Sequence, residues 1–117
     1  MDRTLHLADR SVRTGYVEAV ATSPAHHGSG YGTQVMAEVG EIIRARYELG
    51  GLGTGAQHFY ERLGWLTWRG PTSVLTDGRL VRTPDDDGFI MVLPTPISPP
   101  LDLDGPLACE WRVGDVW

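Results

Sequence analysis

Apolar and polar residues along the 117-residue chain follow the two-residue period of strands in some segments and the longer period of helices in others. Two extended segments come first, residues 3–8 and 12–22, and the polar residues 9–11 between them predict a hairpin. A helix is predicted over 33–47, because apolar side chains recur there at helical spacing between polar ones. These apolar residues are Val35, Met36, Val39, Ile42, Ile43 and Tyr47.

The middle of the chain repeats the order of strand, turn and helix. The short apolar stretch 49–52 leads through residues 53–55 into a second predicted helix over 56–63. Gly64 follows it, and glycine is the residue that most readily takes the left-handed conformation that ends a helix.

The remaining segments predict mainly strands. Asp77-Gly78 is a strong signal for a two-residue hairpin turn. Residues 94–100 hold four of the eight prolines, which predicts an extended connector. The predicted strands are 65–68, 73–75, 79–82, 89–93 and 107–112. The sequence has no internal repeat, and we expect one α/β (α+β) domain over residues 1–117.

Composition narrows the class of protein. With 41% hydrophobic residues, the chain is large enough to form one soluble core. It has no run near the roughly 18 apolar residues of a membrane span and no secretory signal, so we expect a cytoplasmic protein without a membrane partner. The lone Cys109 is expected to be a buried hydrophobic residue. His26 and His27 lack the spacing of a zinc site, so we expect no metal.

The negative charge is concentrated in the C-terminal part. Residues 77–117 carry eight acidic residues and three arginines, whereas residues 1–76 carry seven of each sign, so the net charge of −5 belongs to the C-terminal part. Such a surface repels nucleic acid and attracts polycationic small molecules. We expect no nucleic acid partner, although acidic loops are also ordinary solvated surface.

A glycine-rich loop separates the second predicted strand from the first predicted helix. Gly28, Gly30 and Gly32 stand on alternate positions there, so main-chain N–H groups have room to surround an anion at the positive end of the helix. This arrangement is typical of a diphosphate site, and a purely structural turn is the alternative. A dinucleotide-binding fold is disfavoured, because its loop has the spacing GxGxxG and its acidic residue ends the next strand, whereas Glu48 precedes that strand.

The residues of this loop, His27-Gly28-Ser29-Gly30-Tyr31-Gly32, resemble the Arg/Gln-x-x-Gly-x-Gly/Ala signature of the GNAT superfamily of N-acetyltransferases, with His27 in place of arginine or glutamine. Residues 56–65 resemble the helix of that family whose tyrosine approaches the coenzyme sulfur. The resemblance implies a mixed, mostly antiparallel sheet flanked by helices, and acetyl-CoA as cosubstrate. It assigns the cosubstrate to residues His27 to Gly32 and to the main chain of Val20, Ala21 and Thr22.

Further segments resemble a narrower group, the aminoglycoside 2′-N-acetyltransferases. They are residues 15–20, 64–65, 70–75, 82–88 and 109–117. This resemblance implies transfer of an acetyl group to the 2′-amino group of an aminoglycoside, and hence antibiotic resistance.

Two residues are candidates for catalysis. An amine must lose a proton before it attacks a thioester, and Glu18 is the candidate base, acting through water according to the resemblance. Tyr60 is the candidate donor of a proton to the leaving thiolate, and the amide of Val20 is a candidate donor to the oxyanion. A solvated carboxylate at a strand edge and a core tyrosine are the alternatives.

Recognition of a polyamine needs carboxylates that converge on its ammonium groups. The resemblance assigns this task to Asp86, Asp115 and the α-carboxylate of Trp117. The full set of predicted acceptor-binding residues is Glu18, Ala19, Gly53, Asp86, Asp115 and Trp117. According to the resemblance, Gly53 stands where relatives carry a serine that touches the substrate, so only its main chain would contribute.

The superfamily normally has further strands and helices before the strand that leads to Glu18, and here only sixteen residues precede Val17. We therefore expect a shortened form that lacks the usual N-terminal elements, and a homodimer is one way to support it. The alternatives are an acetyltransferase for another small amine or a peptide N-terminus, and a non-catalytic remnant that binds acetyl-CoA.

Overall fold

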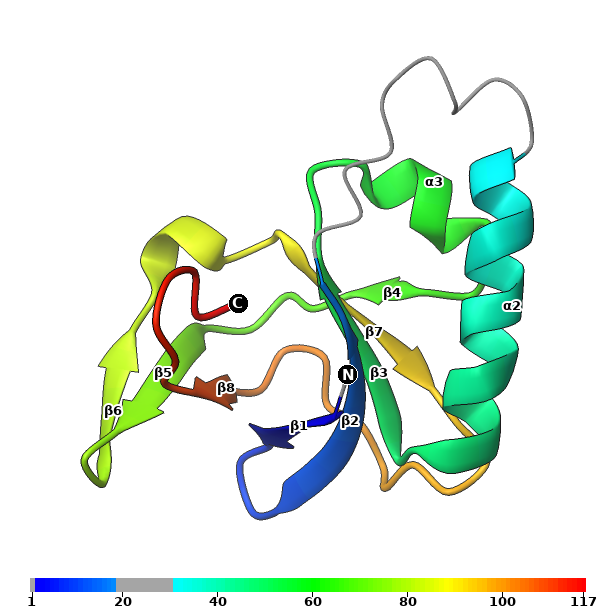
Figure 1. Cartoon of the computed structure of the whole chain (residues 1–117). Coiled ribbons are helices and arrows are strands. Elements are labelled where there is room, and N and C mark those ends of the chain that lie inside the picture. The colour runs from blue at the N-terminus through cyan, green and yellow to red at the C-terminus, as the bar shows by residue number, and fades with distance from the viewer. Residues whose placement is uncertain (1, 19–30) are drawn as a thin grey trace.

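The computed structural model describes residues 2–18 and 31–117. In this part of the chain, eight strands form one sheet in the order β4-β7-β3-β2-β1-β8-β5-β6 (Figure 1). The strands are β1 (Asp2–His6), β2 (Ser11–Val17), β3 (Leu49–Gly53), β4 (Leu66–Thr67), β5 (Thr72–Thr76), β6 (Arg79–Arg82), β7 (Ile90–Pro94) and β8 (Leu107–Glu110). The helices are α2 (Tyr31–Arg46) and α3 (Gln57–Glu61), and a 3₁₀ turn, η1, spans Pro84–Asp86.

The pairing of the strands confirms a mixed, mostly antiparallel sheet. Strand β2 runs parallel to β3 and β5 runs parallel to β8, while the other neighbours are antiparallel. The two predicted hairpins are confirmed: β1 pairs with β2, and β5 pairs with β6. At the second hairpin Asp77 and Gly78 have φ angles of 50° and 74°, which match the right-handed twist of the flanking strands.

Several predicted boundaries differ from the structure. The second strand ends at Val17, and of its predicted remainder residues 19–22 lie outside the described part. Helix α3 ends at Glu61 because Leu63 and Gly64 donate to carbonyls only three residues back, which is a 3₁₀ closure, with Gly64 at φ 94°. The predicted connector 94–100 contains a turn, closed by the N–H of Ser98 on the carbonyl of Thr95.

The two faces of the sheet carry separate hydrophobic clusters, because side chains alternate along each strand. On one face α2 and α3 cover a cluster of Met36, Ile43, Leu52, Tyr60, Trp65, Met91 and Leu93, which we call the helix side. Both described helices lie on this face, so they do not flank the sheet from two sides. Gly50 of β3 lies here without a side chain, and an added Cβ would meet Leu93 at 2.9 Å.

The opposite face is covered by the end of the chain. Its buried cluster, which we call the tail side, consists of Leu5, Val12, Leu49, Trp68, Val74, Ile90, Val92, Leu107 and the predicted buried Cys109. Residues 111–117, here called the tail, turn back from β8 toward η1, and Val116 and Trp117 pack on this cluster (Figure 1). No helix of the described part is long and apolar enough to cross a membrane.

Candidate active site

A cavity of about 590 Å³ opens where β3 ends and β7 begins, beneath the tail. Its wall contains four residues that the sequence predicts to bind an acceptor: Gly53, Asp86, Asp115 and Trp117. They come from three segments that are far apart in the sequence, namely the end of β3, the turn η1 and the tail. The structure therefore brings these four positions to one hollow, which is large enough for a small molecule.

The cavity is electrically negative. Partial burial raises the pKa of Asp86, and the neighbouring charges of Asp85, Asp115 and Asp87 raise it further. A carboxylate in this environment costs free energy until a cation lies beside it. An ammonium group in the cavity would relieve this cost, so the arrangement favours a cationic ligand.

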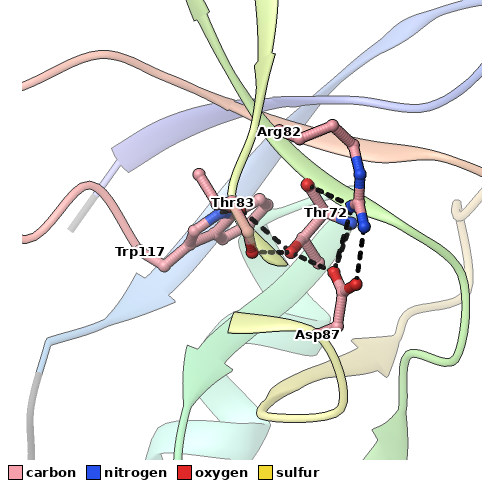
Figure 2. Close-up of polar contacts among 5 residues, drawn as sticks. All are labelled: Thr72, Arg82, Thr83, Asp87 and Trp117. Atoms are coloured by element: carbon pink, nitrogen blue, oxygen red, sulfur yellow. Dashed lines mark hydrogen bonds and ion pairs between the residues drawn. The ribbon is translucent and has the colours of Figure 1, made fainter. Parts of the chain in front are cut away.

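The wall on the tail side is held in place by a chain of hydrogen bonds (Figure 2). The indole N–H of Trp117 donates to the hydroxyl of Thr83 at 3.0 Å, and that hydroxyl donates to the hydroxyl of Thr72, also at 3.0 Å. The main-chain N–H of Thr72 donates to Asp87 Oδ1 at 2.9 Å, and Arg82 Nη2 donates to Asp87 Oδ2 at 2.8 Å. The ring of Trp117 is thus anchored to the β5–β6 hairpin.

Asp86, the last residue of η1, and the following Asp87 have different tasks. Asp86 faces the cavity, whereas Asp87 accepts hydrogen bonds from Arg82 and Thr72, which lower its pKa well below the ordinary range. Of the two, only Asp86 was predicted from the sequence to bind the acceptor. The ion pair between Arg82 and Asp87 was not predicted. The short separation of these opposite charges in the sequence, five residues, was the available signal for it.

Glu18 follows β2 directly, and its carboxylate pairs with the tail. Arg112 Nη1 donates to Glu18 Oε1 at 2.6 Å, and this hydrogen bond is the main reason that the pKa of Glu18 lies below its usual value. The predicted base is therefore ionised but weakly basic while the pair persists. Arg112 was not predicted, and the only signal for it was its place as the single basic residue of the tail.

Tyr16 connects this pair to the cavity. Its side chain is 2% exposed, and its ring centroid lies 5.8 Å from the guanidinium carbon of Arg112. Burial raises the pKa of Tyr16 far above the ordinary value. A Cβ at Gly53 would lie 3.6 Å from the Tyr16 hydroxyl oxygen, so the phenol reaches the cavity wall. By strand alternation Tyr16 lies on the same face of β2 as the position of Glu18.

Tyr60 lies on the helix side, away from the tail. It is 6% exposed and packs edge to face on Phe59 and Trp65, with ring centroids 4.9 Å and 6.3 Å away. Burial raises the pKa of its phenol, which favours the protonated form that a proton donor needs. Its proposed approach to a thiolate remains a prediction.

Most of the predicted cosubstrate loop lies outside the described residues. This holds for Val20, Ala21, Thr22, His27, Gly28, Ser29 and Gly30, and also for the predicted acceptor residue Ala19. Tyr31 and Gly32 form the first turn of α2, which contains no acidic residue to offset the positive end of the helix. Within residues 2–18 and 31–117, no group of three or more His, Cys, Asp or Glu residues is placed to hold a metal ion.

Comparison with known proteins identifies the class. Residues 4–65, from within β1 to the residue before β4, match the model of the acetyltransferase (GNAT) family, and the chain belongs to this family. The resemblance and the fold class inferred from the sequence are thereby confirmed.

A particular relative shares the whole length of the chain. An aminoglycoside 2′-N-acetyltransferase of Mycolicibacterium fortuitum is 43% identical over 121 residues, covering 100% of this chain. The same match covers 62% of the relative, so the chain spans less than two thirds of the length of that enzyme.

Proposed function

We propose that this protein transfers the acetyl group of acetyl-CoA to the 2′-amino group of an aminoglycoside, and that it thereby confers antibiotic resistance. The observation that carries the proposal is the negative cavity that joins Gly53, Asp86, Asp115 and Trp117. The 43% identity to an aminoglycoside 2′-N-acetyltransferase supports the choice of acceptor. Membership of the GNAT family supports acetyl-CoA as cosubstrate, and the reaction belongs in the cytoplasm, where this thioester is available.

The acceptor would be recognised by charge. Its ammonium groups lie beside Asp86 and Asp115, and the indole of Trp117 offers a flat surface to a sugar ring. Gly53 contributes main-chain groups only, and Ala19 is a further acceptor contact in this proposal. The diphosphate of the cosubstrate binds the main-chain N–H groups of the loop from His27 to Gly32 at the start of α2.

The chemistry needs three proton transfers. Glu18, through a water molecule, takes a proton from the acceptor ammonium, and the free amine nitrogen attacks the thioester carbonyl carbon. The N–H of Val20 donates to the oxyanion that forms. The C–S bond then breaks, the thiolate takes a proton from Tyr60, and the nitrogen releases one of its two protons to solvent to give the amide N–H, while solvent returns a proton to the Tyr60 phenolate. The lowered pKa of Glu18 keeps its carboxylate ionised before the acceptor arrives.

The test has two stages with the 117-residue chain. Calorimetry with acetyl-CoA measures cosubstrate binding, and a thiol-release assay then compares two aminoglycosides that differ only in a 2′-amino or 2′-hydroxyl group. We expect binding of acetyl-CoA and turnover with the 2′-amino compound alone. Glu18→Gln should leave cosubstrate binding unchanged and lower turnover by about 10²- to 10⁴-fold.

The other possible results of these assays each reject the proposal or favour one of its alternatives. Equal turnover of both aminoglycosides, or turnover only with other amines or peptide N-termini, rejects the 2′-amino group as the acceptor. Binding of acetyl-CoA without turnover for any amine identifies a non-catalytic binding protein. No binding of acetyl-CoA rejects the proposal as a whole.

A further inference from the structure

Arg112 lies at the point where the end of β2 meets the tail. Its Nη1 donates to Glu18 Oε1 at 2.6 Å, and its Nε donates to the main-chain oxygen of Asp115 at 2.7 Å. A weaker contact at 3.5 Å joins Nη2 to the main-chain oxygen of Trp117. One side chain therefore touches the candidate base and two of the residues that form the wall of the cavity.

These contacts use the shape of the guanidinium group. Its planar fork carries five N–H donors in fixed directions, so it can pair with a carboxylate at one edge and with carbonyls at another. The tail folds back on itself and so brings its own main-chain oxygens to the second edge of the guanidinium group. Gly114 takes part in this turn with φ 83°, a conformation that favours glycine. The segment from Arg112 to Trp117 thus folds around the side chain of Arg112.

We propose that Arg112 is a positioning residue that holds Glu18 and the acceptor-binding tail in one fixed arrangement. The inference rests on the proposed function, in which Glu18 is the base and Asp115 and Trp117 bind the acceptor. The hydrogen bond that the indole of Trp117 donates to Thr83 fixes the ring, but it does not reach Glu18. Arg112 supplies the link between the two, so loss of this side chain disturbs the base and the acceptor site together.

The effect of Arg112 on the pKa of Glu18 gives a way to measure the contact between them. Among the charged groups that act on its carboxylate, Arg112 is the strongest, while Arg3 and the α-amino group act through space, and the buried Tyr16 is neutral at ordinary pH. Removal of the charge at position 112 should therefore move the acid limb of the kcat/KM profile to higher pH. A merely structural residue would not produce this shift.

Two variants separate the tasks of Arg112. Arg112→Lys keeps a positive charge for Glu18, but one ammonium group cannot also reach the main-chain oxygens of Asp115 and Trp117. We expect this variant to raise the KM for the acceptor on the order of tenfold while the acid limb of the profile stays in place. Arg112→Gln loses both contacts, and we expect kcat/KM to fall on the order of a hundredfold with the acid limb shifted.

The matched control is Arg69→Gln. Arg69 pairs with Asp104 at 2.8 Å and 3.1 Å on the surface, and neither residue lines the cavity. This variant should keep the wild-type KM and pH profile. An Arg112→Gln variant that behaves in the same way would overturn the inference while the proposed function stands.

A readout without turnover keeps the inference testable on its own. In the folded 117-residue chain, a carboxypeptidase should release Trp117 on the order of ten times faster from Arg112→Lys and Arg112→Gln than from the wild type or Arg69→Gln. Circular dichroism selects the variants that are folded. Equal release from all four proteins contradicts the role of Arg112, even if the wild type acetylates no amine and the proposed function fails.

Discussion

The two faces of the sheet are held by different kinds of contact. The helix side consists of apolar side chains from α2, α3, β3 and β7, which pack on one another and leave Tyr60 and Trp65 buried. The tail side also has an apolar cluster, but its outer layer is fixed by hydrogen bonds from Trp117 to Thr83, from Thr83 to Thr72 and from Arg112 to Glu18. The proposed acceptor site lies on the second face.

This difference separates stability from specificity. Apolar packing contributes free energy without much direction, whereas hydrogen bonds between charged or polar groups fix the relative position of the groups they join. The tail carries few buried side chains, so it needs directional contacts to take one conformation. The comparison predicts that changes on the helix side mainly alter stability and that changes on the tail side mainly alter acceptor binding.

The largest effect is expected for Trp65→Ala. Trp65 is 1% exposed at the centre of the helix-side cluster, and its removal leaves a cavity that the surrounding strands cannot fill. We expect a loss of about 3–5 kcal/mol in the free energy of unfolding, measured by urea denaturation. Trp111→Ala is the control, because Trp111 is 58% exposed and should change stability by less than about 0.5 kcal/mol. Equal losses for the two variants would contradict the packing described for the helix side.

Asp86→Asn is expected to weaken binding rather than folding. The acceptor loses one carboxylate partner, so we expect its dissociation constant to rise about tenfold, or about 1.4 kcal/mol, in calorimetry. The raised pKa of Asp86 means that the free carboxylate is disfavoured in the folded state, so the variant should be no less stable than the wild type. In the wild type, acceptor affinity should decline as the pH falls through this raised pKa.

The control for this variant is its neighbour. Asp85 is exposed and does not line the cavity, so Asp85→Asn removes the same charge from the same turn at a different place. An equal loss of affinity in both variants would show that the net charge of the turn, and not the position of Asp86, attracts the acceptor.

The sequence predicted the local parts of this arrangement. The spacing of apolar residues gave α2, and Asp77-Gly78 gave the β5–β6 hairpin, because both signals lie within a few neighbouring residues. The parallel pairing of Thr72 to Leu75 with Leu107 to Glu110 has no such local signal. The resemblance to known acetyltransferases named Gly53, Asp86, Asp115 and Trp117, which the fold then brought together.

The contacts that hold the site residues in place could not be predicted from the sequence. Arg112 and Glu18 are 94 residues apart, and Trp117 and Thr83 are 34 apart, so their pairing depends on the register of the whole sheet. Glu110 and Asp115 both stand far nearer to Arg112 along the chain than Glu18 does, and spacing alone does not choose among the three. A hydrogen bond between distant segments can be identified only once the positions of the strands next to those segments are known.

Asp87→Ala is expected to have a moderate effect on stability. The buried N–H of Thr72 loses its acceptor, and the estimated cost is about 1 kcal/mol, the low end of the usual range, because the Asp87 side chain is 35% exposed. The lowered pKa of Asp87 gives stability that is present above the ordinary aspartate pKa of about 3.9 and is lost as the pH falls through the lowered value.

The difference in unfolding free energy between the wild type and Asp87→Ala should therefore shrink in acid. Urea denaturation at neutral pH and at several values below the ordinary aspartate pKa measures this trend. A difference that stays constant or grows toward low pH would contradict the ion pair with Arg82. The variant should also release Trp117 to a carboxypeptidase faster than Asp85→Ala, because only Asp87 supports the chain of hydrogen bonds to the indole.

The smallest effect is expected for Gly53→Ser, and it is a gain. A Cβ at this position meets only Ile90 and the Tyr16 hydroxyl at 3.6 Å and a main-chain oxygen at 3.9 Å, which are ordinary contacts, so the side chain fits without strain. Its hydroxyl would point to the cavity at the position where the resemblance puts a serine in relatives. One added hydrogen bond should lower the KM for the acceptor about threefold, with kcat unchanged. Gly53→Ala, which adds the Cβ without the hydroxyl, should leave KM unchanged, and an equal improvement in both variants would mean that a stiffer end of β3 is the cause.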